Sequence, residues 1–150
     1  MNALLAALVL MWIAVLVGTA QRIFQMPQWF ADPPASFELI RRQSKAARLF
    51  WIPLSVLFVL CASIALIDIW EQTTARNYVL MALAAYALAG VLSAMYFVKE
   101  IIAFSKMPPD GPKTGELLWR TRTWLRWTTV RNVFHWFAAI FLTLAYRALE

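Results

Sequence analysis

The residues best suited to chemistry lie on one face of a segment near the C-terminal end of the chain. They recur at spacings of four, three, four and four, the period of one side of an α-helix, and they are Arg120, Trp124, Trp127, Arg131 and His135. The guanidinium of Arg131 and the imidazole of His135 are hydrogen-bond donors, and the two indole rings are stacking surfaces. Such a face is typical of a pocket for an amphipathic ligand, such as a quinone, a lipid or an aromatic metabolite.

Arg131 needs a partner if this face is buried, because an unpaired charge in an apolar environment is costly. Glu100 is the carboxylate that we expect to pair with it, and Gln21, Arg22 and Gln25 are candidates to join. An interpretation without a ligand is that Arg131 extends to lipid headgroups or forms a purely structural pair with Glu100. The predicted ligand-binding residues are Trp124, Trp127, Arg131, His135 and Glu100.

The other side chains offer little catalytic or metal chemistry. The chain has one Cys and one His, which excludes a disulfide framework and any metal site built from several of these ligands. Nothing else in the sequence supports a haem site. No nucleophile or second acid lies at an obvious spacing from His135. The sequence therefore identifies no catalytic residue, predicts no metal and no cofactor, and leaves open whether the protein is an enzyme.

The elements that position this face are predicted to be membrane-spanning helices. Hydrophobic residues make up 62% of the 150 residues and charged residues 15%, against about 45–50% and about 25% in a soluble domain. Stretches without a charged side chain cover residues 1–21, 49–67, 77–98 and 132–146. Crossing a bilayer takes about 20 residues, so the first three stretches are long enough and the fourth is not.

The fourth stretch reaches spanning length only if the charged face enters the membrane. Counting about 20 residues back from Arg147 places its cytoplasmic boundary near Trp127. At about 1.5 Å per residue, Arg131 then lies about 6 Å and His135 about 12 Å inside that boundary. We therefore predict a single all-α domain over residues 1–150, a bundle of four transmembrane helices that span approximately residues 2–21, 49–68, 77–98 and 127–147.

The basic residues are distributed unevenly between the two sides of this bundle. Twelve of the 14 Lys and Arg residues lie in or beside the first and third loops, and only Arg76 and Arg147 lie on the other side. The positive-inside rule then places those loops in the cytoplasm and both termini outside. Contact with anionic headgroups explains the net charge of +6, and no nucleic-acid motif competes with that explanation. The expected partners are the lipid bilayer and a small amphipathic molecule, with no nucleic acid and with the oligomeric state left open.

The loops add three expectations. Residues 35–50 form a basic amphipathic segment, with Asp32 as its N-cap, that lies at the membrane interface or continues directly into the second span. A break at residues 106–112 precedes one long final helix, which Thr114 caps. Small residues in the third span are expected to pack inside the bundle, namely Ala82, Ala85, Ala89 and Ser93.

Two groups of short motifs resemble known membrane proteins. One group is similar to small bacterial integral membrane proteins that have no assigned activity. It comprises the stretch that runs from Gly18-Thr19-Ala20 to Pro27-Gln28-Trp29, then Asp32-Pro33-Pro34-Ala35-Ser36, and then Phe50-Trp51-Ile52-Pro53. The last helix of proteins grouped with the anthrone-oxygenase-like family resembles Arg120-Thr121-Arg122-Thr123-Trp124-Leu125-Arg126-Trp127 followed by Val130-Arg131. Anthrone oxygenases tend to have a Pro-Ile-Asn-like element where this chain has Val98-Lys99-Glu100-Ile101. The resemblance implies a four-span protein of about this length, and it implies a fold more directly than a function.

Residues and resemblance together lead to three functional hypotheses. The first is a non-enzymatic protein of the bacterial cytoplasmic (inner) membrane that binds a lipid-like or aromatic amphipathic ligand, or a membrane partner, near the cytoplasmic leaflet. The second is a cofactor-independent oxygenase of the anthrone-oxygenase-like type. The third is an accessory subunit of a larger membrane complex.

Overall fold

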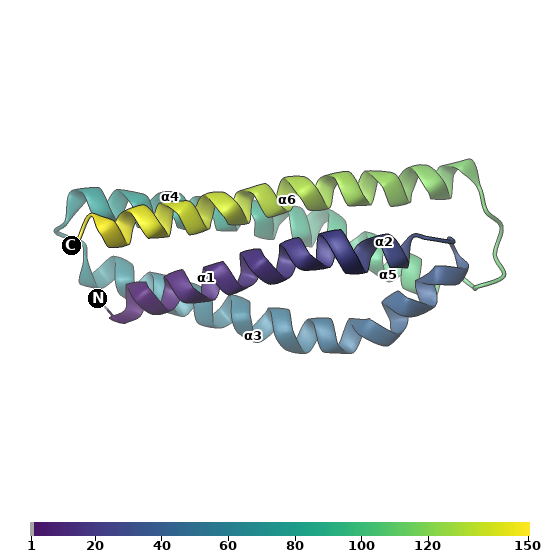
Figure 1. Cartoon of the computed structure of the whole chain (residues 1–150), viewed down its shortest axis with the longest axis horizontal. Coiled ribbons are helices and arrows are strands. Elements are labelled where there is room, and N and C mark those ends of the chain that lie inside the picture. Colours follow the sequence, from purple (N-terminus) through teal and green to yellow (C-terminus); the bar gives the residue numbers. More distant parts are fainter. Residues whose placement is uncertain (1) are drawn as a thin grey trace.

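The computed structural model describes residues 2–150, which are helical almost throughout and contain no β-strand (Figure 1). α1 (Asn2–Ala20) continues through a π-helical turn, η1 (Gln21–Gln25), into the short α2 (Met26–Trp29). A 3-10 turn, η2 (Ala35–Phe37), leads into α3 (Glu38–Asp68). α4 (Thr73–Leu92) continues through a second π-helical turn, η3 (Ser93–Phe97), into α5 (Val98–Lys106), and α6 (Gly115–Arg147) completes the fold.

Three helical stretches are long and apolar enough to cross a membrane: Asn2–Trp29, Ala35–Asp68 and Thr73–Lys106. The first three predicted spans lie within them. The fourth stretch, α6, has 33 residues, and its first half carries most of its basic residues. The predictions of an all-α fold and of one long final helix are therefore confirmed.

The helices form an elongated bundle with both termini at the same end (Figure 1). α6 lies along α4, and α1 packs against both α3 and α6. A hydrogen bond from Trp12 Nε1 to Thr143 Oγ1, 3.3 Å long, joins α1 to α6. α3 makes much less contact with α4 and α5 than with α1. The side of the bundle between α3 and α4–α5 is therefore its most loosely packed side.

The N-cap predicted from the sequence is confirmed for α6 and is wrong for α3. Thr114 Oγ1 accepts a hydrogen bond from the backbone N–H of Leu117 at 3.1 Å, as predicted for the N-cap of the final helix. Asp32 is not an N-cap, because the 3-10 turn η2 separates it from α3, and its carboxylate pairs instead with Lys113. α3 runs without a break from Glu38 to Asp68, so the amphipathic segment continues directly into the second span.

Two groups of buried side chains hold the bundle together. The alanine core, toward the termini, is rich in small buried residues, among them Ala7, Ala62, Ala82, Ala85, Ala138 and Ala139. The aromatic core, toward the opposite end, comprises Met26, Trp29, Phe37, Ile40, Phe97, Phe104, Leu117 and Trp124. The expectation that the small residues of the third span face inward is confirmed for its three alanines.

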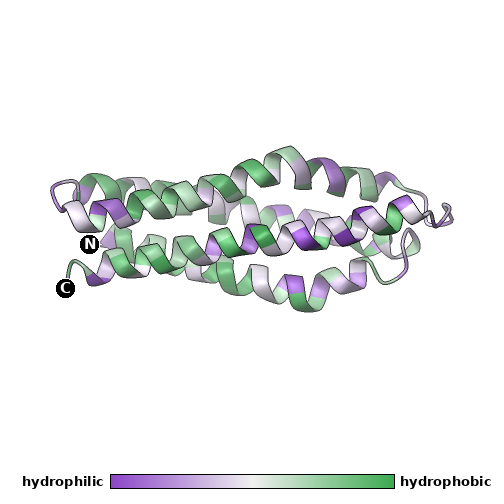
Figure 2. Ribbon diagram, turned by 90° about the horizontal axis from the view of Figure 1, so that it is seen from above, coloured by the Kyte–Doolittle hydropathy of each residue, from purple (hydrophilic) through white to green (hydrophobic). Residues whose placement is uncertain are grey.

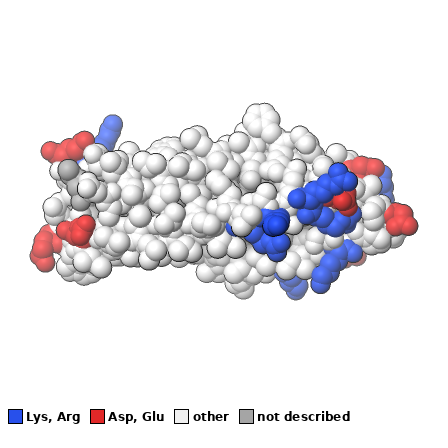
Figure 3. Space-filling view, turned by 90° about the horizontal axis from the view of Figure 1, so that it is seen from below, with Lys and Arg blue, Asp and Glu red and all other residues white. Residues whose placement is uncertain are grey.

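The outer surface has the character expected of a protein in lipid. Large apolar side chains such as Leu16, Ile67 and Met95 are exposed on it, which in a soluble monomer is rare over so large an area. Figure 2 shows hydrophobic ribbon over most of the bundle, with hydrophilic residues more frequent toward the end opposite the termini. In the face that Figure 3 shows, Lys and Arg gather toward that same end, and a wide band beside them carries no charged side chain.

Candidate functional site

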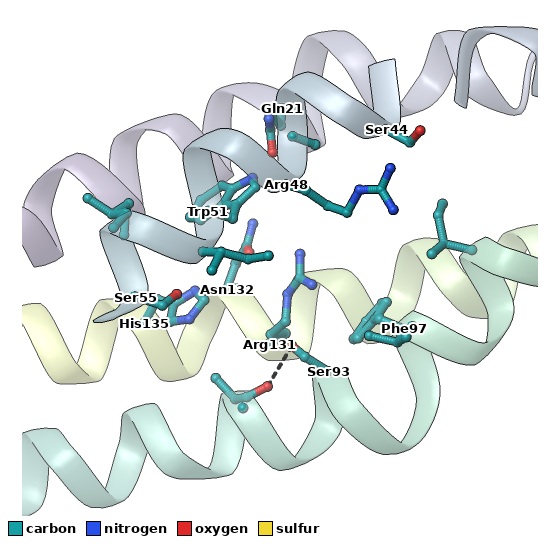
Figure 4. Close-up of a pocket in the computed structure, with 18 of the residues that line it drawn as sticks. Gln21, Ser44, Arg48, Trp51, Ser55, Ser93, Phe97, Arg131, Asn132 and His135 are labelled. Atoms are coloured by element: carbon teal, nitrogen blue, oxygen red, sulfur yellow. Dashed lines mark hydrogen bonds between the residues drawn. The ribbon is translucent and has the colours of Figure 1, made fainter. Parts of the chain in front are cut away.

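A cavity of about 670 Å³ lies between the alanine core and the aromatic core. Met11, Ala14 and Phe58 of the first core and Trp29, Phe97 and Trp124 of the second contribute to its walls. Most of the lining is apolar, and the polar exceptions include Gln21, Arg48, Ser93, Arg131, Asn132 and His135 (Figure 4). Its size is within the range of about 300–1,000 Å³ that is usual for small-molecule sites.

Arg131 is the most unusual residue of this cavity. Its guanidinium projects from α6 into the cavity, and the carbon Cζ lies 4.4 Å from the centre of the Phe97 ring (Figure 4). This cation–π contact provides no hydrogen-bond acceptor for the N–H groups of the guanidinium. The Nε atom is buried and has no hydrogen-bond acceptor within residues 2–150. A buried cation without a carboxylate partner is costly, which points to a function.

His135 and Asn132 lie near Arg131 on the same helix. The His135 ring is 5.7 Å from the ring of Tyr86 on α4, measured between centroids, and it faces the cavity (Figure 4). Asn132 Nδ2 donates a hydrogen bond to the backbone carbonyl of Gly18 at 3.2 Å, which fixes α6 against α1. Ser93 Oγ donates to the Ala89 carbonyl at 2.8 Å, so its hydroxyl hydrogen is already used.

Both π-helical turns border the cavity. Gln21 of η1 contributes to one wall, and Ser93 and Phe97 of η3 contribute to another. π-Helical turns are rare and occur frequently at functional sites. Two of them around one cavity are a further reason to regard it as the functional site, and nothing in the sequence pattern had indicated them.

The expected pair of Glu100 and Arg131 is wrong. Glu100 accepts hydrogen bonds from the Nε and Nη2 atoms of Arg120, at 3.1 and 3.2 Å. The helical stretch from α4 to α5 is antiparallel to α6, and the contacts Phe97–Trp124 and Tyr86–His135 fix their register. Arg131 therefore faces the region of Gly90, about ten residues or about 15 Å along the helix from Glu100.

The two tryptophans of the predicted face have different surroundings. Trp124 is buried among Trp29, Phe30 and Phe97, whose ring centres are 5.2–6.1 Å away, so it is mainly part of the aromatic core and contributes only an edge to the cavity. Trp127 is 43% exposed on the outer surface and lies outside the cavity. Of the five predicted site residues, the structure brings together Trp124, Arg131 and His135.

The three candidate partners from the end of the first span do not join Arg131. Gln21 contributes to the cavity wall, but Arg22 Nε donates to the Leu125 carbonyl and to Thr129 Oγ1, both at 3.2 Å. Gln25 donates to Gln43, which also accepts from the indole of Trp29. These bonds attach the first helical stretch to α6 and α3, and none of the hydrogen bonds within residues 2–150 involves the Arg131 guanidinium.

Residues of α3 are the part of the site that the sequence analysis missed. Ser44, Arg48, Trp51 and Ser55 line the cavity opposite α6 (Figure 4). Their spacings of four, three and four also describe one helical face. The periodicity that identified the face on α6 was therefore present in α3, but Arg48 had been assigned to the basic surface of the interfacial segment.

Neither a metal-binding cluster nor a known relative adds to this description of the site. Within residues 2–150, no three His, Cys, Asp or Glu side chains gather closely enough to hold a metal ion. No protein-family model, curated protein or solved structure matches the chain. The site is thus defined by its geometry: an apolar cavity with a few polar side chains and the guanidinium of Arg131, whose buried Nε has no acceptor within residues 2–150.

Proposed function

We propose that the chain is a non-enzymatic integral membrane protein that binds a lipid-like or aromatic amphipathic ligand in this cavity. α6 is its fourth membrane span, over approximately residues 127–147, and the membrane is the bacterial cytoplasmic membrane. Both termini lie outside, so the cavity is near the cytoplasmic leaflet. The single observation that carries the proposal is the mostly apolar cavity into which Arg131 projects without a hydrogen-bond acceptor.

The surroundings of the cavity support an amphipathic ligand over a soluble one. Ile52 and Val56 of α3 and Val98 and Ile102 of α5 line the cavity and are also about half exposed on the outer surface. These side chains place the opening of the cavity on the loosely packed side between α3 and α5. An opening lined by apolar side chains and surrounded by lipid favours a ligand that is itself dissolved in the membrane.

An oxygenase of the anthrone-oxygenase-like type is the second candidate. The observation in its favour is that His135 lines the same cavity as Arg131, where a bound polycyclic aromatic would be near a base. The membrane partner and the accessory subunit receive less support. A lipid-facing stripe of small residues would favour a subunit contact, but Ala82, Ala85 and Ala89 are buried inside the bundle.

Native mass spectrometry of the full chain, extracted in a mild nonionic detergent, tests the proposal. We expect a bound molecule of low mass on the wild type, at one per chain. Gly90 lines the cavity, and a Cβ atom added there meets no heavy atom within 4 Å. Gly90→Trp should therefore fill the cavity or its opening without strain and remove the bound molecule.

Gly115→Trp is the matched control, because Gly115 is equally open but lies at the start of α6, outside the cavity. It should retain the bound molecule. A wild type without a ligand, or a Gly90→Trp variant with unchanged occupancy, would contradict the proposal. If the molecule released from the wild type is an oxygenated product of an added polycyclic aromatic, the oxygenase is favoured instead.

A further inference from the structure

The charged side chains that line the cavity are all basic. Arg48 and Arg131 contribute to its walls, and no Asp or Glu does so. The acidic residues nearest in the fold have other partners: Glu38 pairs with Arg41 and Arg42, and Glu100 pairs with Arg120. The cavity therefore combines a large apolar surface with two guanidinium groups whose charge no carboxylate in its lining balances.

The two arginines line the cavity from opposite walls, and Arg48 is at the same time exposed at the surface of the bundle. Arg48 projects from α3 and Arg131 from α6 (Figure 4). The Cζ atom of Arg131 lies over the Phe97 ring, 4.4 Å from its centre, and this contact holds the guanidinium beside that ring. A planar guanidinium held in this way matches the two oxygen atoms of a carboxylate or a phosphate. No ion pair or hydrogen bond within residues 2–150 engages the Arg48 guanidinium, so it is available for the same group.

The depth of the two arginines fits a lipid headgroup. Arg48 directly precedes the charge-free stretch 49–67 of α3. Arg131 lies about 6 Å inside the proposed boundary of α6, but helical side chains lean toward the N-terminus of their helix, and its guanidinium reaches back to the level of Phe97. Both groups thus lie near the edge of the apolar layer. The apolar part of the cavity continues from them toward Met11, Phe58 and Tyr86, deeper in the bundle.

On the basis of the proposed ligand-binding function, we infer that the ligand is an anionic amphiphile with a long apolar chain. Its carboxylate or phosphate head lies between Arg48 and Arg131, and its chain occupies the cavity between the two cores. The ligand enters sideways through the apolar opening between α3 and α5. Because the arginines lie at headgroup depth, the head of a lipid in that leaflet needs little vertical movement, which keeps the cost of desolvating it low.

Binding of three probes with the same hydrocarbon chain tests this inference. The full chain, freed of bound lipid in nonionic detergent, is titrated with oleate, oleoyl-lysophosphatidate and oleyl alcohol, and occupancy is read by native mass spectrometry. We expect at least one of the two anions to bind about tenfold or more tightly than the neutral alcohol, as for hydrogen bonds to a charged group. The stronger of the two anions identifies the headgroup as a carboxylate or a phosphate.

Arginine variants provide the matched comparison. Arg48→Gln and Arg131→Gln should each weaken anion binding about tenfold and leave the alcohol unchanged, and Arg131→Lys should retain part of the affinity. Arg42→Gln makes the same charge change on α3, outside the cavity, and should have little effect. An equal loss in Arg42→Gln would show a general surface-charge effect and overturn the inference.

The remaining outcomes separate this inference from the proposed function. If all three probes bind equally well and Gly90→Trp blocks them all, the ligand-binding function stands and the anionic headgroup is wrong. If no probe binds and Gly90→Trp changes nothing, both are wrong. Unchanged oleate and lysophosphatidate affinity in Arg48→Gln and Arg131→Gln would likewise overturn the role of the two arginines.

Discussion

At the scale of single residues, the pairing of charges depends on the register of two antiparallel helices. We expected Glu100 to pair with Arg131 because both lie toward the same end of the bundle. In the observed register Glu100 pairs with Arg120 instead, and Arg131 lies over the Phe97 ring. Residue types and helical period predict which side chains share a face. They do not predict how far one helix is shifted along its neighbour, and here Arg120 and Arg131 are separated by about three helical turns.

A double-mutant cycle distinguishes the two pairings. Glu100→Gln should lower the free energy of unfolding by about 1–3 kcal/mol, since it leaves the partly buried Arg120 without its carboxylate. Combining it with Arg120→Gln should cost clearly less than the sum of the single changes, and combining it with Arg131→Gln should be additive. Unfolding in a mixed-micelle denaturant series provides the measurement. Coupling between Glu100 and Arg131 would contradict the observed register.

Glu38 links stability to pH at the beginning of α3. Hydrogen bonds from Arg41, and next from Arg42, hold the pKa of its carboxyl below the ordinary value of 4.5. Its stabilising contribution is therefore complete above the pKa of the unfolded chain and is lost as the pH falls through the lower pKa of the folded protein. The same Arg41 donates hydrogen bonds to the carbonyls of Ser105 and Met107, at 3.3 and 3.1 Å. The ionisation of Glu38 therefore also influences how the start of α3 is attached to the end of α5.

The prediction is that the melting temperatures of wild type and Glu38→Gln differ near neutral pH and converge as the pH falls below about 4.5. Glu71→Gln is the control, because Glu71 is exposed and has no ion pair within residues 2–150. Its difference from the wild type should be small at every pH. A Glu38→Gln difference that does not change between neutral and acidic pH would show that the carboxylate is not engaged by the two arginines.

At the scale of elements, local signals predicted the helix boundaries where one side chain is decisive. The Thr114 cap and the Pro-rich break before it are read directly from residue types. Asp32 carries the same kind of signal, but the turn that follows it removes its carboxylate from the start of α3 and directs it to Lys113. A cap is thus predictable only if the next turn of backbone is already helical, which depends on the surrounding loops.

The capping bond of α6 gives a prediction at this scale. Thr114→Ala should destabilise the protein by about 1 kcal/mol, since the N–H of Leu117 loses its acceptor. Thr74→Ala is the control, because Thr74 is exposed in the first turn of α4 and its hydroxyl takes part in no hydrogen bond there. It should be neutral or slightly stabilising, since alanine favours a helix more than threonine does. Equal losses in both variants would show that the Thr114 hydroxyl contributes nothing specific.

At the scale of the whole molecule, the sequence predicted the apolar stretches and a pocket beside the charged face of α6, but it did not predict the other walls of that pocket. Long runs without charge identify three helices that can cross a membrane, because hydrocarbon excludes charge over a fixed length. The cavity depends on the separation of α3 from α4 and α5 and on the rotation that turns Arg48 toward Arg131. These are properties of packing between distant segments. On α6 the helical period predicted Trp124, Arg131 and His135 together with Trp127, which lies outside the cavity. On α3 the same period was present, but only the assembled bundle shows that this face lines the cavity.

The distribution of charge along the bundle predicts how it is oriented. The loop at residues 107–114 lies at the end where Lys and Arg gather, and the turn at residues 69–72 lies at the opposite end, near the termini (Figures 1 and 3).

Cysteine labelling tests this orientation. In a Cys61→Ala background, which removes the single native thiol, one cysteine is placed at the exposed Asp110 or Gln72. A membrane-impermeant maleimide added to intact bacterial cells should label Gln72→Cys and spare Asp110→Cys, and disruption of the cells should make both reactive, because positively charged loops remain in the cytoplasm. Labelling of Asp110→Cys in intact cells would reverse the topology and place the arginines of the cavity at the outer leaflet.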